Sequence, residues 1–401
     1  MRTAGQPLGR TPVLVIGAGP VGLVAAIRLR EQGVDVRIVD EQTETSKRTY
    51  PVVIHPRTLR LLSSLGMTAP LEWRGRAIRH LAIYADEMRR AVLSLPAAEP
   101  ISPGVLTLPQ DVLRQALVHR LSTLGVEVEW KTRLVAIEQD PARARVELVR
   151  RESVEGPGFK TEWLDVASQT FEVDFVVAAD GIRSTVRRAL GIEMVQHGAR
   201  EIYAFFDAAD QRAGDEAHLV FSGGYRSSVY PLQGSVSRFS FQVGAGALQL
   251  PAVTHLRQLL SDRMPWYAGG VDDFEWSGSA EFHPALAARF SEGRVWLAGD
   301  AAHATGPLGG QSINVGMHEA DDLALRMAEA FRDWNFDRLG PRYCEQRRIE
   351  WGRFFGLGPS KPDTSRAPDW VRRHVGALLP SLPAAGDDLD DLLEQLGVKS
   401  A

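Results

Sequence analysis

The stretch GDAAHATGPLGGQSINVG, residues 299–316, joins an apolar run that predicts a strand to an amphipathic run that predicts a helix. Its first part, residues 299–310, is the third joint of this kind in the chain, and it carries few bulky side chains. A joint so poor in side chains lets a ligand approach the backbone at a helix N-terminus, where free N–H groups favour negative charge. His303 is interpreted as structural rather than as an acid or base.

The first joint, residues 17–22, has the spacing G-x-G-x-x-G after the β-branched run VLVI. Gly17 allows a tight turn, Gly19 lets the backbone approach a pyrophosphate, and Gly22 lets the helix pack on the strand. Pro20 and Val21 complete the loop at the start of the predicted helix. The first joint therefore predicts a phosphate cradle.

The run VDVRIVD, residues 34–40, predicts a second strand, and it ends in an acid about twenty residues after the first joint. Asp40 is expected to accept hydrogen bonds from ribose hydroxyls, and the adjacent Glu41 is a possible substitute. Strand, glycine loop, helix, strand and terminal acid together predict dinucleotide binding.

The second joint, residues 180–184, follows the buried-strand pattern DFVVAA and precedes a helix that carries several arginines. Taken alone, Asp180 and Gly181 fit a ligand site or an ordinary Asp-Gly turn equally well. Three such joints spread along the chain indicate one extended ligand that the backbone touches at several points.

Composition limits the class of protein. The 401 residues, 44% of them hydrophobic, suffice for a large core and two domains. The net charge of -4 gives no general attraction for nucleic acid or anionic membranes, and the apolar run 12–27 is too short and too broken by glycine to span a bilayer. Cys344, the single cysteine, cannot form an intrachain disulfide, which favours a cytoplasmic location. The absence of a second G-x-G-x-x-G argues against a reductase with two dinucleotide domains, and no metal is predicted.

The three joints, in this order, resemble the FAD-dependent aromatic hydroxylases, single-component flavoprotein monooxygenases similar to para-hydroxybenzoate hydroxylase, over about residues 12–350. The resemblance implies FAD as cofactor, NADPH or NADH as transient electron donor, and O2 as co-substrate. It implies insertion of one oxygen atom into an aromatic, phenolic or polyketide-like small molecule through a flavin C4a-hydroperoxide. Epoxidation, Baeyer–Villiger oxidation and halogenation on the same fold stay open, as does a non-catalytic binding protein.

The resemblance also assigns roles to residues. Asp300 would bond the ribityl chain, the loop from Pro307 would lie beside the isoalloxazine ring, and the amides near Ile313 would meet the flavin pyrimidine edge. No catalytic residue is assigned, and the flavin-face candidates are Pro307 and Gly309. The full expected FAD-binding set is Gly17, Gly19, Pro20, Val21, Gly22, Asp40, Glu41, Arg48, Gln110, Asp180, Gly299, Asp300, Pro307, Gly310, Ser312, Ile313 and Asn314.

Three of these assignments carry an expectation of their own. Ser312 stands where the family often has glycine, and Arg48 lies two residues before the position expected for the family's FAD-contacting arginine. Gly309 is expected to serve backbone approach or a positive φ, so Gly309→Leu should fold but lose hydroxylation.

The predicted fold class is α/β, with a discontinuous Rossmann-like FAD domain at residues 1–78, 102–193 and 284–357. A mostly antiparallel β substrate domain is expected at 79–101 and 194–283, and a short helical tail at 358–401. In the tail, Leu389, Leu392, Leu393 and Leu396 share one helical face, and the neighbouring acids are interpreted as a solvated face. Possible pocket residues, which fit sheet packing as well, are Tyr203, Tyr225, Tyr230 and His218.

Overall fold

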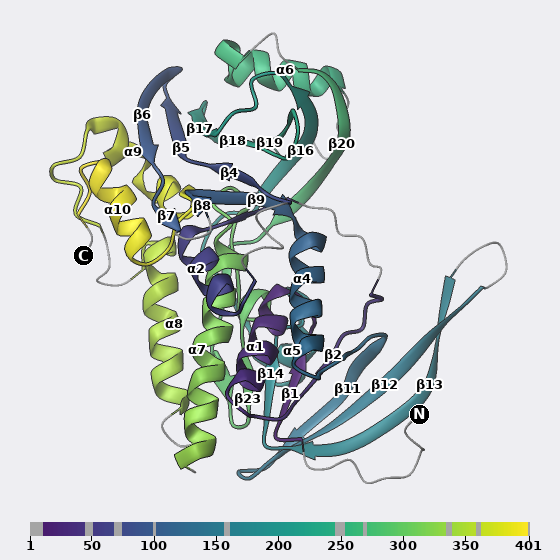
Figure 1. The fold of residues 1–401 in the computed structure, drawn as a ribbon. Helices are drawn as coiled ribbons and strands as arrows, with labels where there is room; N and C mark the ends of the chain where they lie inside the picture. The colour runs from purple at the N-terminus through teal and green to yellow at the C-terminus, as the bar shows by residue number, and fades with distance from the viewer. Residues whose placement is uncertain are drawn as a thin grey trace.

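The computed structural model describes residues 11–44, 51–67, 74–98, 102–155, 161–244, 253–267, 271–333, 339–357 and 362–399. A helix-covered parallel sheet forms one part of the molecule, and a larger, mostly antiparallel sheet lies across one end of it (Figure 1). The fold is mixed α/β, as predicted.

The parallel sheet has the strand order β10-β2-β1-β14-β23-β22, in which β22 pairs antiparallel with β23 and the other strands are parallel. Its strands are β10 (Val128–Glu129), β2 (Val36–Val39), β1 (Val13–Ile16), β14 (Phe175–Ala178), β23 (Val295–Leu297) and β22 (Ser291–Glu292). β1, β14 and β23 are fully buried apolar runs, as expected for strands covered on both faces. They pair in parallel so that Ile16 is level with Ala178, and Ala178 with Leu297. The three predicted joints therefore leave the sheet at the same edge.

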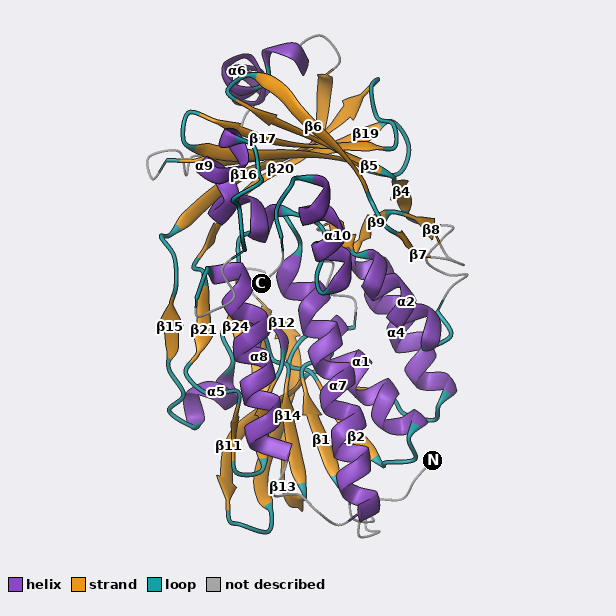
Figure 2. Cartoon of the chain, turned by 90° about the vertical axis from the view of Figure 1, so that its left-hand side faces the viewer, coloured by secondary structure: helices purple, strands orange, loops and turns teal. Residues whose placement is uncertain are grey.

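Helices α1 (Pro20–Glu31) and α7 (Gln311–Asp333) pack against each other beside this sheet, and α4 (Gln110–Thr123) packs on α1 (Figure 2). α2 (Pro56–Ser64) and α8 (Leu339–Phe355) also contact α7. Gly22 permits the tight entry of α1, because a Cβ there would lie 1.9 Å from the Gly17 carbonyl oxygen.

The larger sheet has the order β20-β16-β19-β18-β17-β5-β6. Its strands are β20 (Val271–Phe282), β16 (Glu201–Asp210), β19 (Val236–Val243), β18 (Tyr225–Pro231), β17 (Glu216–Ser222), β5 (His80–Ala85) and β6 (Met88–Ser94). Alternation along β16 divides its two faces. Ile202, Ala204 and Phe206 form a core with α6 (Val253–Arg263), which leaves Glu201 and Tyr203 on the opposite face.

Smaller sheets complete the fold. β3 (Pro51–Ile54), β9 (Val105–Pro109) and β4 (Arg76–Ile78) form one; β15 (Met194–Gln196), β21 (Ala285–Ala287) and β24 (His303–Ala304) form another; β7 (Ala97–Ala98) pairs with β8 (Ser102–Pro103). β11 (Thr132–Gln139), β12 (Ala144–Glu155) and β13 (Thr161–Val173) project as a long three-stranded sheet (Figure 1). Short helical turns are α5 (Thr185–Ala189), η2 (Pro265–Tyr267) and η3 (Gly299–Ala301).

The C-terminal tail contains α9 (Asp369–Leu378), η4 (Leu379–Ser381) and α10 (Asp387–Gln395). The leucine face predicted for α10 is confirmed, since all four leucines are buried. The solvated acidic face is wrong in part. Asp388 is buried and pairs with Arg60 at 2.7 Å, and Asp390 pairs with Arg353. These acids hold the tail against the rest of the chain. None of the described helices is long and apolar enough to cross a membrane.

Candidate functional site

The three joints abut at the shared edge of the parallel sheet. Gly17 has φ +104°, and a Cβ there would lie 2.2 Å from the Ala179 carbonyl oxygen, so the first and second joints meet at backbone distance. Val21 reaches the third joint, because a Cβ on Gly299 would lie 2.9 Å from its Cγ2. An extended ligand at this edge would contact all three joints.

The first joint has the shape of a phosphate cradle. Gly19 is the N-cap of α1, and no side chain caps this end of the helix. A Cβ built on Gly19 would meet no atom within 4 Å. Open space therefore lies beside the unpaired N–H groups of the first helical turn, where a pyrophosphate binds favourably.

The structure distinguishes the two acids after β2. Asp40 is half-buried; its Oδ2 accepts the Ala18 N–H at 2.6 Å and its Oδ1 accepts the Gln42 N–H at 2.7 Å. Glu41 is exposed, and its carboxylate lies 3.7 Å from the Arg151 guanidinium. Asp40 is thus the acid that faces the first joint.

In the second joint, Asp180 uses only one of its oxygens. Oδ2 accepts the N–H groups of Thr185 at 2.7 Å and Val186 at 3.2 Å, which caps α5. Oδ1 is buried with no hydrogen-bond partner among the described residues, and burial raises the pKa of this carboxyl. A buried polar atom left without a partner marks a place for a ligand donor.

The arginines after the second joint serve the protein itself. Arg187 is buried and donates to the carbonyl oxygens of Ala301 at 2.9 Å and Ile182 at 3.0 Å. Arg187 therefore ties the second joint to the third.

A buried acid that sequence reasoning missed holds the third joint. Glu319 on α7 is inaccessible to solvent; its Oε2 accepts the Gly299 N–H at 3.0 Å and lies 2.8 Å from His303 Nε2. Its Oε1 accepts the Trp351 indole N–H at 2.7 Å. Burial raises the pKa of Glu319, but the charges and hydrogen bonds around it, His303 first, outweigh burial and bring the pKa below its ordinary value. His303 is fully buried, which fits the structural role expected for it, and Asp300 is exposed.

Asn314 ties the start of α7 to β3 through its side chain. Oδ1 accepts the His55 N–H at 2.8 Å, and Nδ2 donates to the carbonyl oxygens of Val53 at 2.7 Å and Gly310 at 2.8 Å. Burial lowers the pKa of His55 to about 4, so the ring is neutral at pH 7, and its Nε2 lies 2.7 Å from the Gly309 carbonyl oxygen. The side chain of Asn314 thus holds the start of α7 against β3, and its contact with FAD stays a prediction.

Of the two reasons expected for Gly309, the positive φ is wrong, whereas a close approach of backbone is confirmed. Gly310, not Gly309, has the positive φ, +63°. A Cβ on Gly309 would lie 2.4 Å from the Pro380 carbonyl oxygen, so this glycine serves the close approach of the tail. Gln311 strengthens the same contact by donating from Nε2 to the Leu382 carbonyl oxygen at 2.6 Å.

The FAD contacts expected of Gln110, Ser312 and Arg48 stay predictions. Gln110 is half-buried at the first position of α4, and the Ser312 hydroxyl lies 3.2 Å from that of Thr305. Arg48 falls outside the described residues.

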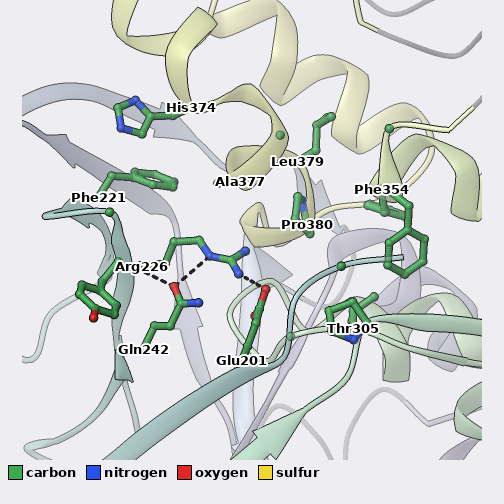
Figure 3. Close-up of a pocket in the computed structure, with 18 of the residues that line it drawn as sticks. Glu201, Phe221, Arg226, Gln242, Thr305, Phe354, His374, Ala377, Leu379 and Pro380 are labelled. Atoms are coloured by element: carbon green, nitrogen blue, oxygen red, sulfur yellow. Dashed lines mark hydrogen bonds and ion pairs between the residues drawn. The ribbon is translucent and has the colours of Figure 1, made fainter. Parts of the chain in front are cut away.

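A pocket of about 710 Å³ lies between the larger sheet, the third joint and the tail (Figure 3). The third joint contributes Thr305 and Gly306, directly before Pro307. The sheet and the tail contribute most of the remaining wall, including Glu201, Phe221, Arg226, Gln242, His374, Ala377, Leu379 and Pro380.

An ion pair forms the polar part of this pocket. The Arg226 guanidinium pairs with Glu201 Oε1, with side chains only 14% and 13% exposed, and the Arg226 backbone N–H donates to Gln242 Oε1 at 3.1 Å (Figure 3). The Tyr203 hydroxyl donates to Glu201 Oε2 at 3.2 Å, and burial raises the pKa of Tyr203. A Cβ on Gly306 would lie 2.6 Å from Glu201 Oε2, so the carboxylate sits against the third joint.

Of the other suggested pocket residues, one lines the pocket and two pack inside the protein. Tyr225 lines the pocket, whereas Tyr230 is buried in the core. His218 packs against the rings of Tyr84 and Trp266, and burial lowers its pKa to about 4. The polar pair of Glu201 and Arg226 was missed. Its members are 25 residues apart, on β16 and β18, so no local spacing in the sequence indicates the pair.

Three backbone joints meet at the carboxyl edge of a parallel sheet, with room for a ligand at Gly19 and an unpaired oxygen at Asp180. This arrangement defines a dinucleotide-binding fold. The third joint also borders a pocket. Residues 10–350 match the family described as FAD binding domain, and the chain belongs to that family.

The curated relatives include two monooxygenases. The chain is 29% identical over 352 residues to 6-methylpretetramide 4-monooxygenase of Streptomyces rimosus, covering 85% of this chain and 60% of that protein. It is 29% identical over 324 residues to pentachlorophenol 4-monooxygenase of Sphingobium chlorophenolicum, covering 79% and 58%. The chain thus spans about three fifths of the length of these relatives.

Solved structures share the fold. The p-nitrophenol 4-monooxygenase PnpA of Pseudomonas putida DLL-E4 matches with a TM-score of 0.72 at 22% identity, covering 96% of both chains. The ternary complex of aklavinone-11 hydroxylase with FAD and aklavinone matches with a TM-score of 0.60 at 26% identity, covering 82% of this chain and 64% of that one.

Proposed function

We propose that this protein is a FAD-dependent monooxygenase that uses NADPH or NADH and O2 to hydroxylate an aromatic small molecule. The observation that carries the proposal is the position of the pocket. Thr305 and Gly306 belong both to the pocket wall and to the joint that completes the cofactor cradle. A substrate in this pocket would lie next to the loop where the cofactor ring is expected.

The residues at the sheet edge fit FAD. The space beside Gly19 suits the pyrophosphate, and the Asp40 carboxylate lies where it could accept hydrogen bonds from ribose hydroxyls. The unpaired Oδ1 of Asp180 could accept a hydrogen bond from a further donor on the cofactor. The N-terminus of α7 would stabilise negative charge at the flavin pyrimidine edge. When bound, FAD would supply the acceptance of a hydride from NAD(P)H and the activation of O2.

The chain's own residues position the substrate and exclude water. Arg226 and Glu201 offer a donor and an acceptor at one end of the pocket, and the hydroxyl of Tyr203, kept protonated by its raised pKa, fixes the carboxylate. Apolar side chains such as Phe221 and Leu379 contribute further parts of the wall, beside polar ones such as Gln242. A ring bearing a hydroxyl group is thereby held by hydrogen bonds at one end and by apolar contacts along its faces.

The test begins with the purified protein, which should be yellow and release FAD on denaturation. A panel of phenols should then stimulate NAD(P)H oxidation. Arg226→Gln should lower this stimulation about ten-fold, the cost of about one charged hydrogen bond, while FAD content stays unchanged. Arg89→Gln is the matched control, because Arg89 pairs with Glu216 on the same sheet but away from the pocket wall.

A spectrum without flavin bands, unchanged by added FAD, would contradict the proposal and favour a binding protein on this fold. If phenols stimulate NAD(P)H oxidation equally in the Arg226 and Arg89 variants, the substrate does not bind in this pocket.

A further inference from the structure

One wall of the pocket comes from residues that follow the family match, which ends at residue 350. α9 and η4 supply most of that wall, and they face the strand that carries Arg226 (Figure 3). The end of α8 contributes Phe354 and Phe355, and the tail contributes His374, Gly376, Ala377, Leu379 and Pro380.

Contacts outside the pocket fix the position of this wall. Gln311 binds the carbonyl oxygens of Leu382 and Ala384, and Asp388 pairs with Arg60. The Gln395 amide exchanges two hydrogen bonds with the Ser94 backbone, at 2.9 and 3.0 Å. A change in a side chain that only lines the pocket therefore leaves the wall itself in place.

Ala377 occupies the pocket-facing side of α9. His374 is three residues earlier, on the same helical face, and both residues line the pocket. Figure 3 places Ala377 between His374 and Leu379, across the pocket from Arg226. Ala377 is half-buried, and its side chain is a single methyl group, so the space in front of it is left to a ligand.

The volume of the pocket indicates the size of ligand that would fill it. An apolar cavity of about 150 Å³ already holds benzene, whereas this pocket encloses about 710 Å³. Pockets of about 300–1,000 Å³ hold molecules of several rings. A single phenol ring would leave much of the wall formed by α9 without contact.

We propose that α9, through the small side chain of Ala377, sets the size of the substrate and selects fused-ring aromatics with hydroxyl groups over single-ring phenols. This rests on the proposed function, since it assigns the same pocket to the substrate. The ring system extends from the pair of Arg226 and Glu201 to the helix, and a larger side chain at position 377 shortens that path.

Binding measurements test this without turnover. The FAD-loaded full chain and its variants are titrated with dihydroxyanthraquinone, a fused-ring probe, and with catechol, a single-ring probe, and quenching of intrinsic fluorescence reports binding. Ala377→Leu keeps a good helix former at this position. Arg372→Leu is the matched control, because Arg372 lies on the same helix, is exposed and does not line the pocket.

Ala377→Leu should weaken dihydroxyanthraquinone binding by about ten-fold or more and change catechol binding by less than about two-fold. Arg372→Leu should change neither. Unchanged binding of the fused-ring probe to Ala377→Leu would overturn the role of α9, and stronger binding of catechol than of dihydroxyanthraquinone to the parent would overturn the substrate class. If the fused-ring probe binds as expected yet NAD(P)H oxidation never responds to any phenol, the proposed function fails while the size rule stands.

Discussion

The first and third joints both contain glycines at a strand-to-helix junction, but the glycines face different things. A Cβ on Gly19 would enter open space beside the N-terminus of α1, whereas a Cβ on Gly309 would collide with the Pro380 carbonyl oxygen. The first glycine is kept free for a ligand, and the second for the chain's own tail. A glycine in a binding motif can therefore be required either by a ligand or by the packing of the chain itself. Substitutions distinguish these two requirements.

The acids of the two joints differ in the same way. Asp40 is half-buried at the edge of the first joint, while Glu319 is fully buried behind the third and bonds only to protein groups. The third joint is therefore held by an acid buried behind it, and the first by an acid at its edge that is partly open to solvent.

Removing the buried acid should have the largest effect. Glu319→Ala leaves the Gly299 N–H, His303 and the Trp351 N–H without their acceptor, and breaking such a buried pair costs about 3–5 kcal/mol. Denaturant unfolding of the variant measures the loss. Glu329→Ala, at an exposed position on the same helix, is the control. Equal unfolding midpoints for the two variants would show that the network does not stabilise the third joint.

Gly309→Leu should destabilise the fold by about 1–3 kcal/mol, because the new side chain has to displace the backbone at Pro380. This replaces the expectation that the variant folds and loses only its activity. Limited proteolysis should show earlier cleavage in the tail than in the parent. A variant with parental stability and an intact tail would mean that Gly309 is not packed as described.

Gly19→Ala should leave the free energy of unfolding within about 0.5 kcal/mol of the parent, because its Cβ meets no protein atom. FAD affinity should fall by about ten-fold, since the methyl group occupies the space of the pyrophosphate. Titration of the apoprotein with FAD measures this. Parental affinity would place the phosphates elsewhere.

The contribution of Glu319 should also depend on pH. Its pKa lies below the ordinary value of 4.5 in the folded state, so its stabilising effect is present above that pH and is lost as the pH falls through the folded pKa. The free energy of unfolding should therefore fall less steeply from about pH 6 to about pH 3 in Glu319→Gln than in the parent. Parallel curves would argue that other groups govern acid unfolding.

The sequence allowed prediction of those parts of the site that depend on local spacing. Strand, glycine loop, helix and terminal acid lie within 28 residues, from Val13 to Asp40, and parallel pairing then brings the other joints to the same edge. The roles of Glu319, of His55 and of the tail depend on contacts between residues far apart in the chain. One signal was present for Glu319. It falls four residues after Val315 and four before Leu323, in the buried stripe of an amphipathic helix.

The central claim is that the pocket beside the third joint holds an aromatic substrate that receives one atom of O2. Mass spectrometry of the product formed under isotopically heavy O2, with NADPH or NADH and the phenol panel, tests it most directly. The expected result is a hydroxylated product that carries one heavy oxygen atom, formed by the parent and much less by Arg226→Gln. A flavin-loaded protein that oxidises NAD(P)H with every phenol but transfers no heavy oxygen to any of them would contradict it.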